Sequence, residues 1–215
     1  MASTCEMAIQ SIVKINPEKP EQSIISRAGE MLNRGGLVAA PTETRYGLLA
    51  RIDNSPAVEK LFEIKGRNID KPSAIFVKDI SQLKQLALVS PVSQKLADSF
   101  LPGPLTLVLR SQRDFGAFFT QNQMTGFRIS SSPVIAAILA KTGPLSATSA
   151  NLSGQKEPEL ISEVYVQLGD KIDLYIDAGR LNNPPSTVVQ VINDRVKILR
   201  EGSLSSQAVM KAIDQ

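Results

Sequence analysis

The chain has 215 residues, of which 42% are hydrophobic and 21% charged, and its formal net charge is +3 with a pI of about 9.0. This composition is typical of one globular domain and argues against a disordered or fibrous chain. The chain has no histidine and one cysteine, Cys5, which excludes an intramolecular disulfide, a Cys/His zinc site and nucleophilic catalysis with a histidine base.

The N-terminal stretch lacks both a basic leader and an apolar segment of signal-peptide length. The longest apolar run, residues 134–140, is too short to span a bilayer. We therefore expect a cytoplasmic protein with no membrane contact. We also expect residues 1–19 to be a loose N-terminal extension, in which Cys5 is incidental, and residues 20–215 to form the folded domain.

The first predicted helix has Ile24, Ile25, Ala28, Met31 and Leu32 on one face and ends at residues 35–36, which are both glycine. A short apolar strand over 37–40 follows, broken at 41–44, and extended character resumes over 46–52. The next helix is expected to begin with Ser55 as its capping residue and proline after it, and to end at a glycine, residue 66.

Helices and strands continue to alternate along the rest of the chain. Strands are expected over 73–77, 105–109, 126–130, 145–148 and 174–176, and helices over 83–88, 92–100, 133–141 and 159–168. Strands over 187–192 and 196–199 should form a hairpin through Asn193-Asp194, before a last helix over 205–213. This alternation predicts an α/β fold, and the hairpin argues against a purely parallel sheet.

Two cations flank a glycine in Lys65-Gly66-Arg67, and residues 60–84 hold six Lys or Arg against three Asp or Glu. A phosphate about 4 Å from one such cation gains roughly 4 kcal/mol near a protein surface. We expect both side chains to be exposed in a cleft. The simpler alternatives are a helix C-terminal cation for Lys65 and a surface ion pair with Asp70 for Arg67.

A second polar cluster covers residues 146–154, where Ser149 and Asn151 are spaced by two and so share a side of an extended chain. The alternative is a turn cluster that ends at Gly154. Glu43, in the loop at 41–44, is either a general base or a solvated side chain. Neither G-x-x-x-x-G-K-[ST] nor G-x-G-x-x-G occurs, so a bound nucleotide must be held in another way.

Six motifs resemble, in order, those of the YrdC/TsaC family of threonylcarbamoyl-AMP synthases. They are PTETRYGL at 41–48, EIKGR at 63–67, PGPLT at 102–106, SANLSG at 149–154, PSTVV at 185–189 and LREG at 199–202. The resemblance covers roughly residues 20–214 and implies the single-domain form of the family. It implies a YrdC-like catalytic domain over 20–215, built on an open twisted sheet, mixed parallel and antiparallel, flanked by helices and with a concave central cleft.

The resemblance also implies a reaction. Bicarbonate adds to the amine of L-threonine, and the carbamate attacks the α-phosphate of ATP and expels pyrophosphate, with Mg²⁺ accompanying the triphosphate and no metal ligand from protein side chains. The product would pass to the threonylcarbamoyl transfer machinery that modifies tRNA. Catalysis by positioning and charge stabilisation needs no nucleophilic dyad, which agrees with a chain without histidine.

Site residues follow from the motifs. The implied catalytic tetrad is Lys65, Arg67, Ser149 and Asn151; the ATP-binding set is Lys65, Ser149, Asn151 and Arg200; and the threonine-binding set is Thr42, Arg67, Arg128 and Ser186.

The sequence departs from the family pattern at Arg45, Lys78 and Ser130. Arg45 either tunes the pocket toward a more anionic ligand or points outward, and we favour the second. Two alternative functions stay open from the sequence. One is a module of the same fold that binds double-stranded RNA or tRNA without catalysis, and the other is a carbamate-adenylating enzyme with a different acceptor amine.

Overall fold

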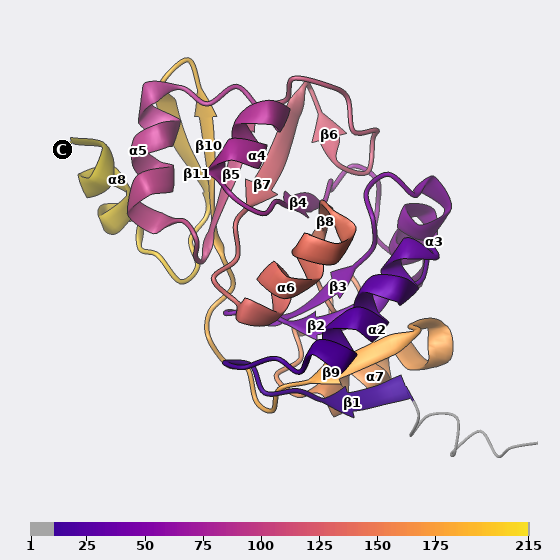
Figure 1. Ribbon diagram of the computed structural model, residues 1–215. Coiled ribbons are helices and arrows are strands. Elements are labelled where there is room, and N and C mark those ends of the chain that lie inside the picture. Colours follow the sequence, from indigo (N-terminus) through magenta and orange to yellow (C-terminus); the bar gives the residue numbers. More distant parts are fainter. Residues whose placement is uncertain (1–10, 215) are drawn as a thin grey trace, which may run out of the picture.

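A computed structural model describes residues 11–214. Its strands form one sheet in the order β1-β9-β2-β3-β8-β4-β7-β5-β10-β11, with β6 paired to β7 (Figure 1). The strands are β1 (Ile12–Lys14), β2 (Val38–Pro41), β3 (Tyr46–Leu49), β4 (Ala74–Phe76), β5 (Leu105–Arg110), β6 (Thr120–Gln121), β7 (Met124–Arg128), β8 (Leu145–Ser149), β9 (Leu174–Asp177), β10 (Thr187–Ile192) and β11 (Arg195–Arg200).

The sheet is mixed and open, as the sequence predicted. The pairs β1–β9, β2–β9, β4–β7 and β5–β10 are parallel, and the other neighbours are antiparallel. Strands β1 and β11 are the two edges. Strand β8 joins the two halves, because Ser149 pairs with Gly47 of β3 while Ala147 pairs with Ala74 of β4. This pairing brings together segments that lie between about 70 and 100 residues apart in the sequence.

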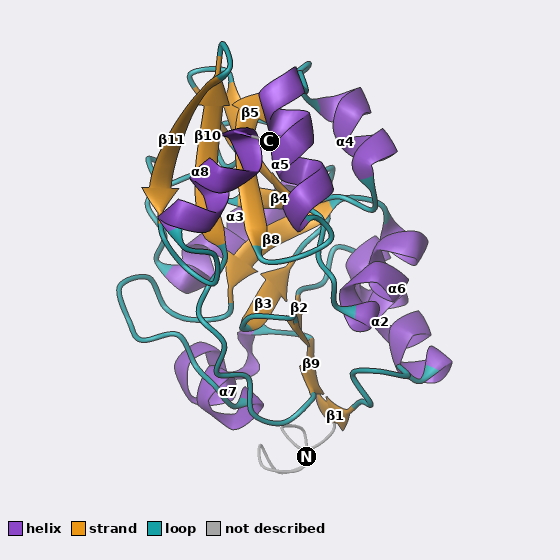
Figure 2. Cartoon of the chain, turned by 90° about the vertical axis from the view of Figure 1, so that its left-hand side faces the viewer, coloured by secondary structure: helices purple, strands orange, loops and turns teal. Residues whose placement is uncertain are grey.

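Helices cover the sheet in two groups. They are α2 (Gln22–Asn33), α3 (Ser55–Lys65), α4 (Ile80–Leu86), α5 (Pro91–Phe100), α6 (Pro133–Thr142), α7 (Ile161–Leu168) and α8 (Ser206–Asp214). Helices α2 and α6 bury one core with one face of β2, β8 and β9, while α3 and α7 contribute to a second core on the other face. Figure 2 shows α2 and α6 on the side of the lower strands opposite α7. Within residues 11–214, no helix is long and apolar enough to cross a bilayer.

Local sequence signals explain most element boundaries. Gly66 ends α3 in the left-handed conformation, with φ of 56°. The predicted cap of this helix is wrong by one residue, because the Asn54 side chain, and not that of Ser55, accepts the hydrogen bond from the amide of Ala57 at 3.1 Å. The predicted hairpin between β10 and β11 is confirmed, and both of its turn residues have positive φ.

The segment expected to be a loose extension contains an ordered strand. Ile12, Val13 and Lys14 pair in parallel with β9, and Ile15 beyond them is buried. The part of the extension from residue 11 onward therefore joins the sheet, because its apolar side chains reach the core that α2 and α6 cover. Cys5 and the rest of residues 1–10 lie outside the described residues.

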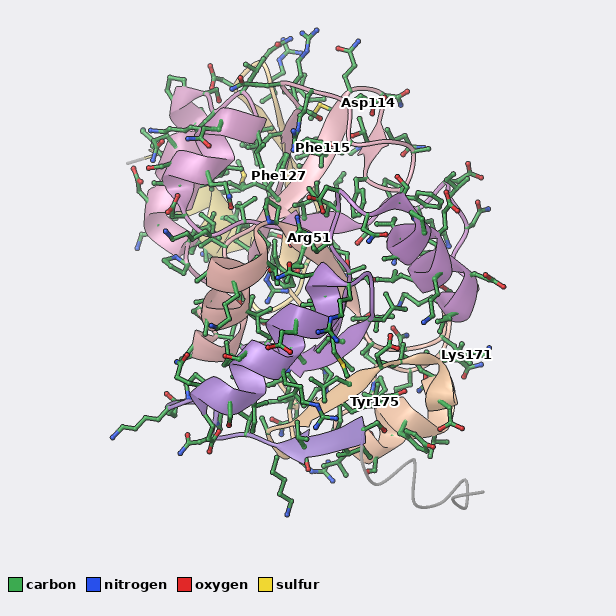
Figure 3. All side chains as sticks on the ribbon, turned by 45° about the vertical axis from the view of Figure 1, so that its right-hand side comes forward. Arg51, Asp114, Phe115, Phe127, Lys171 and Tyr175 are labelled. Carbon is green, nitrogen blue, oxygen red and sulfur yellow. The ribbon has the colours of Figure 1, made fainter. Side chains whose placement is uncertain are left out.

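The short hairpin formed by β6 and β7 was not predicted. Its turn places Asn122 and Gln123 at positive φ. The loop before it is fixed by an aromatic contact. The rings of Phe115 and Phe127 lie edge to face, 5.8 Å apart (Figure 3). Phe127 of β7 is fully buried, so this contact attaches the loop to the core.

Candidate functional site

A cleft of about 400 Å³ lies over one face of the sheet, where residues of β3, β8, β4, β7, β5, β10 and β11 line it. Side chains alternate across each strand there, so that Leu107 of β5 is buried in the core while its neighbours Thr106 and Val108 line the cleft. Strand β10 does the same with Val188 and Gln190. Helices α4 and α5 cover the opposite face of these strands (Figure 2). The floor of the cleft is therefore the face that these helices leave open.

Three guanidinium groups that the family resemblance implied as site residues meet in this cleft. Arg67 follows α3, Arg128 ends β7 and Arg200 ends β11, and all three line the cleft. Burial and the charge of Arg200 lower the pKa of Arg67. Burial lowers the pKa of Arg200, the charge of Glu157 opposes this effect, and the charge of Arg128 adds to it. The cations thus act on one another, which favours an anionic ligand between them.

Arg67 is fixed by main-chain oxygens. Its Nε donates to the carbonyl of Lys71 at 2.6 Å and its Nη2 to that of Pro72 at 2.9 Å. Its Nη1 donates to Oγ1 of Thr148 at 3.2 Å. The alternative surface ion pair with Asp70 does not form. The charge of Arg67 therefore stays available to a ligand while its orientation is fixed.

Lys65 differs from the sequence expectation. Its side chain is only 2% exposed and lies outside the lining of the cleft, so the predicted exposure is wrong. The ammonium donates to the carbonyls of Ser149 and Asn151, the latter at 2.7 Å, and to Oδ1 of Asn151 at 3.3 Å. An ammonium has three donors, and these three oxygens occupy them. Burial and the charge of Arg67 lower its pKa to about 7, against the opposite effect of Glu157.

Ser149 and Asn151 have different roles in the geometry. Ser149 lines the cleft, and its hydroxyl donates to Oδ1 of Asn151 at 2.6 Å. The amide of Asn151 donates to the carbonyls of Leu152 and Gln155, at 2.9 and 2.8 Å. The structure brings the four residues of the implied tetrad together, but only Arg67 and Ser149 face the cleft, while Lys65 and Asn151 support the loop after β8.

Thr42 and Ser186 both line the cleft. Oγ1 of Thr42 donates to the carbonyl of Arg45 at 2.6 Å and closes the turn between β2 and β3. The carbonyl of Ser186 accepts from Nη2 of Arg200 at 2.8 Å, and its hydroxyl lies 3.0 Å from that of Thr106. Both predicted threonine-binding hydroxyls are thus placed within the cleft by bonds to its wall.

Glu43 is neither a free base nor a solvated side chain. One of its oxygens accepts from Nη2 of Arg128 at 2.8 Å, and the other accepts from the hydroxyl of Ser130. Arg128 also donates to Oγ1 of Thr44 at 3.0 Å. Its Nε is buried without a hydrogen-bond partner. Ser130, one of the departures from the family pattern, therefore donates a hydrogen bond to the Glu43 oxygen that Arg128 does not contact.

Arg45 does not point outward, so the reading that we favoured is wrong. It lines the cleft, and its Nη1 donates to the carbonyl of Leu181 at 2.9 Å and lies 3.6 Å from Glu159. Its Nε lies 3.9 Å from Glu157. Two carboxylates therefore offset its charge. Lys78, by contrast, is exposed beside Asp79 and lies away from this cleft.

The sequence reasoning missed two kinds of cleft residue. Thr106 and Thr148 could have been found from the period of two in their strands, since each lies on the open face. Glu157 carries no local signal, because it lies in a loop before α7 and reaches the cleft only through the fold.

Comparison with known proteins identifies relatives of this chain. The family model Sua5_yciO_yrdC, described as telomere recombination, matches residues 30–202. A putative threonylcarbamoyl-AMP synthase of Methanocaldococcus jannaschii is 32% identical over 204 residues, which are 94% of this chain and 97% of that one.

Two solved structures are similar throughout the fold. The crystal structure of Pyrococcus abyssi Sua5 complexed with L-threonine has a TM-score of 0.87 and 32% identity, and the match covers 94% of this chain and 60% of that one. The crystal structure of Escherichia coli YciO has a TM-score of 0.85 and 26% identity, with coverage of 92% and 98%. The chain belongs to the Sua5/YciO/YrdC family.

Proposed function

We propose that this chain is a nucleotidyltransferase that makes L-threonylcarbamoyl-AMP from L-threonine, bicarbonate and ATP, with release of pyrophosphate. The observation that carries the proposal is the meeting of Arg67, Arg128 and Arg200 around one cleft in a member of this family. The names of several relatives, and the threonine bound to Pyrococcus abyssi Sua5, support the choice of substrates.

The cleft suits a reaction that proceeds by positioning. A carbamate and a triphosphate are both anions, and bringing them together requires cations that offset their repulsion. Arg67 and Arg200 are fixed by carbonyl oxygens, so little reorganisation is needed when a ligand binds. Ser149 adds a hydroxyl at the same surface. The carbamate oxygen attacks the α-phosphorus, and the bond to the pyrophosphate oxygen breaks.

Mg²⁺ would accompany the ATP. Among residues 11–214, no group of three His, Cys, Asp or Glu side chains could hold a metal ion. The cleft therefore fits an ion that the triphosphate and water coordinate, and not one held in a protein cage. When bound, such an ion would offset part of the charge of the phosphates.

The adenylate would serve the threonylcarbamoyl transfer machinery that modifies tRNA in the cytoplasm. Neither alternative function gains support from the cleft. The enzyme with another acceptor amine rested mainly on an added cation at Arg45, and Glu157 and Glu159 offset that cation. The RNA-binding module would use the arginines for phosphate contacts, but no feature of the cleft favours it over adenylation.

The test is incubation with ATP and bicarbonate, adding each amino acid in turn and reading the nucleotide products by mass spectrometry. We expect an AMP adduct that depends on threonine, with one pyrophosphate released for each adduct. The variant Arg67→Met should lose the adduct. Lys197→Met, at an exposed site on β11, should keep it. An adduct with another amine, or binding of RNA without any adduct, would refute the proposal.

A further inference from the structure

Glu157 is the one acidic side chain among the described residues that line the cleft. It lies in the loop between β8 and α7, and its side chain is 27% exposed. Within residues 11–214 its carboxylate accepts no hydrogen bond, and its contact with Nε of Arg45 at 3.9 Å is longer than a hydrogen bond. The carboxylate therefore has its acceptor capacity free and faces the site.

The surroundings of Glu157 are strongly cationic. Its charge raises the pKa of both Lys65 and Arg200, which places it near the tetrad as well as near Arg45. Nε of Arg45 is itself buried and lacks an acceptor. An unused donor and an unused acceptor thus lie side by side at the edge of the cleft.

An amino acid brings an ammonium as well as a carboxylate into this site. Arginines that attract its carboxylate repel its ammonium, so the ammonium requires a negative partner. Two other carboxylates lie close to the site and both have partners: Glu43 accepts from Arg128 and Ser130, and Glu159 pairs with Arg180 and Arg45. Glu157 is left as the acceptor for a cationic amine.

We propose that Glu157 binds the ammonium group of the amine substrate and that Arg45 positions the carboxylate of Glu157. The inference rests on the proposed function and adds a specificity-determining residue to it. Arg45 suits the positioning role because its Nη1 is anchored to the carbonyl of Leu181 and faces Glu159. An amine substrate would then be recognised at both of its charged groups.

Steady-state formation of the AMP adduct tests this assignment. Glu157→Gln keeps the shape of the side chain and removes its charge. Loss of a charge-assisted hydrogen bond should raise the KM for threonine about tenfold to a hundredfold and leave the KM for ATP within about twofold. Arg45→Met should raise the KM for threonine by a smaller factor. Glu63→Gln removes one exposed carboxylate from α3, away from the cleft, and should leave both constants unchanged.

Binding of a deaminated analogue provides a test that does not depend on turnover. In titration calorimetry, wild-type protein should bind threonine at least about tenfold more tightly than 2,3-dihydroxybutanoic acid, which has a hydroxyl in place of the amine. Glu157→Gln should lose this preference.

The possible outcomes separate this inference from the proposed function. Equal binding of the two ligands by wild-type protein, or an unchanged KM for threonine in Glu157→Gln, would refute the role of Glu157 while the adduct is still made. Absence of a threonine-dependent adduct in wild-type protein would refute the proposed function itself. Should Glu157→Gln fail to fold, equal binding of the two ligands by wild-type protein would still refute the role of Glu157.

Discussion

Replacing Lys65 with methionine should change the stability of the protein by an amount that depends on pH. Methionine keeps the length and apolar character of the buried stem but removes the ammonium. The carbonyls of Ser149 and Asn151 then lose a donor, which costs about 1–3 kcal/mol for each buried acceptor.

The opposing effect is that the substitution removes a charge whose burial destabilises the folded protein. Burial and the charge of Arg67 lower the pKa of Lys65 from its ordinary value of 10.5 to about 7. Between these two values the unfolded chain binds more protons than the folded one, so the cost of the charged state is fully present below pH 7 and disappears as the pH rises toward 10.5. From pH 7 to 9.5 this relief in the wild-type protein amounts to roughly 3 kcal/mol, at about 1.4 kcal/mol for each pH unit at most.

Lys65→Met should therefore be close to wild type in stability at pH 7 and become less stable than wild type by a further 3 kcal/mol or so at pH 9.5. Urea unfolding of both proteins at pH 7, 8, 9 and 9.5, followed by circular dichroism, measures the difference. Lys84→Met, at an exposed site on α4, controls for the loss of one positive charge. A difference between Lys65→Met and wild type that stays constant over this range would contradict the description of Lys65 as a buried, titrating cation.

Four further substitutions test the geometry around the cleft and the start of α3. Gly202→Ala should destabilise the protein by about 1–3 kcal/mol, since an added Cβ would lie 2.1 Å from the carbonyl oxygen of Pro185, and thermal unfolding would reveal it. Asn54→Ala should lower the free energy of unfolding in urea by about 1 kcal/mol, and Ser55→Ala should lower it much less. A larger loss in Ser55→Ala would show that Ser55, and not Asn54, caps the helix. Tyr46→Phe removes a buried hydroxyl that donates to the carbonyl of Gly179 at 2.6 Å, so the free energy of unfolding should fall in the same assay. A fall below about 0.5 kcal/mol would contradict a stabilising role for this hydrogen bond.

Most of the secondary structure could be predicted because it depends on neighbours in the sequence. The period of the apolar residues located α2, and Asn193-Asp194 located the hairpin of β10 and β11. Where the prediction failed, tertiary contacts supplied the missing energy. Strand β1 is only three residues long and is stabilised by pairing with β9, which lies about 160 residues further along the chain.

The chemistry of the site could also be predicted in part. The motifs indicated that Arg67, Ser149 and Arg200 belong to one site, and the fold places all three in the cleft. The same motifs could not distinguish a side chain that faces the ligand from one that supports it. Lys65 and Asn151 share the motifs with their neighbours but are buried behind the loop after β8.

The sequence by itself determined the class of fold, the family and the types of residue available for chemistry, because periodicity, turn residues and motifs are local properties of the chain. Only the tertiary structure decided which charges remain free. Strand β8 lies between β3 and β4, and this order, which the sequence does not state, sets the distances between distant segments. It leaves Arg67 open to a ligand, encloses Lys65 among carbonyl oxygens and places Glu157 opposite Arg45.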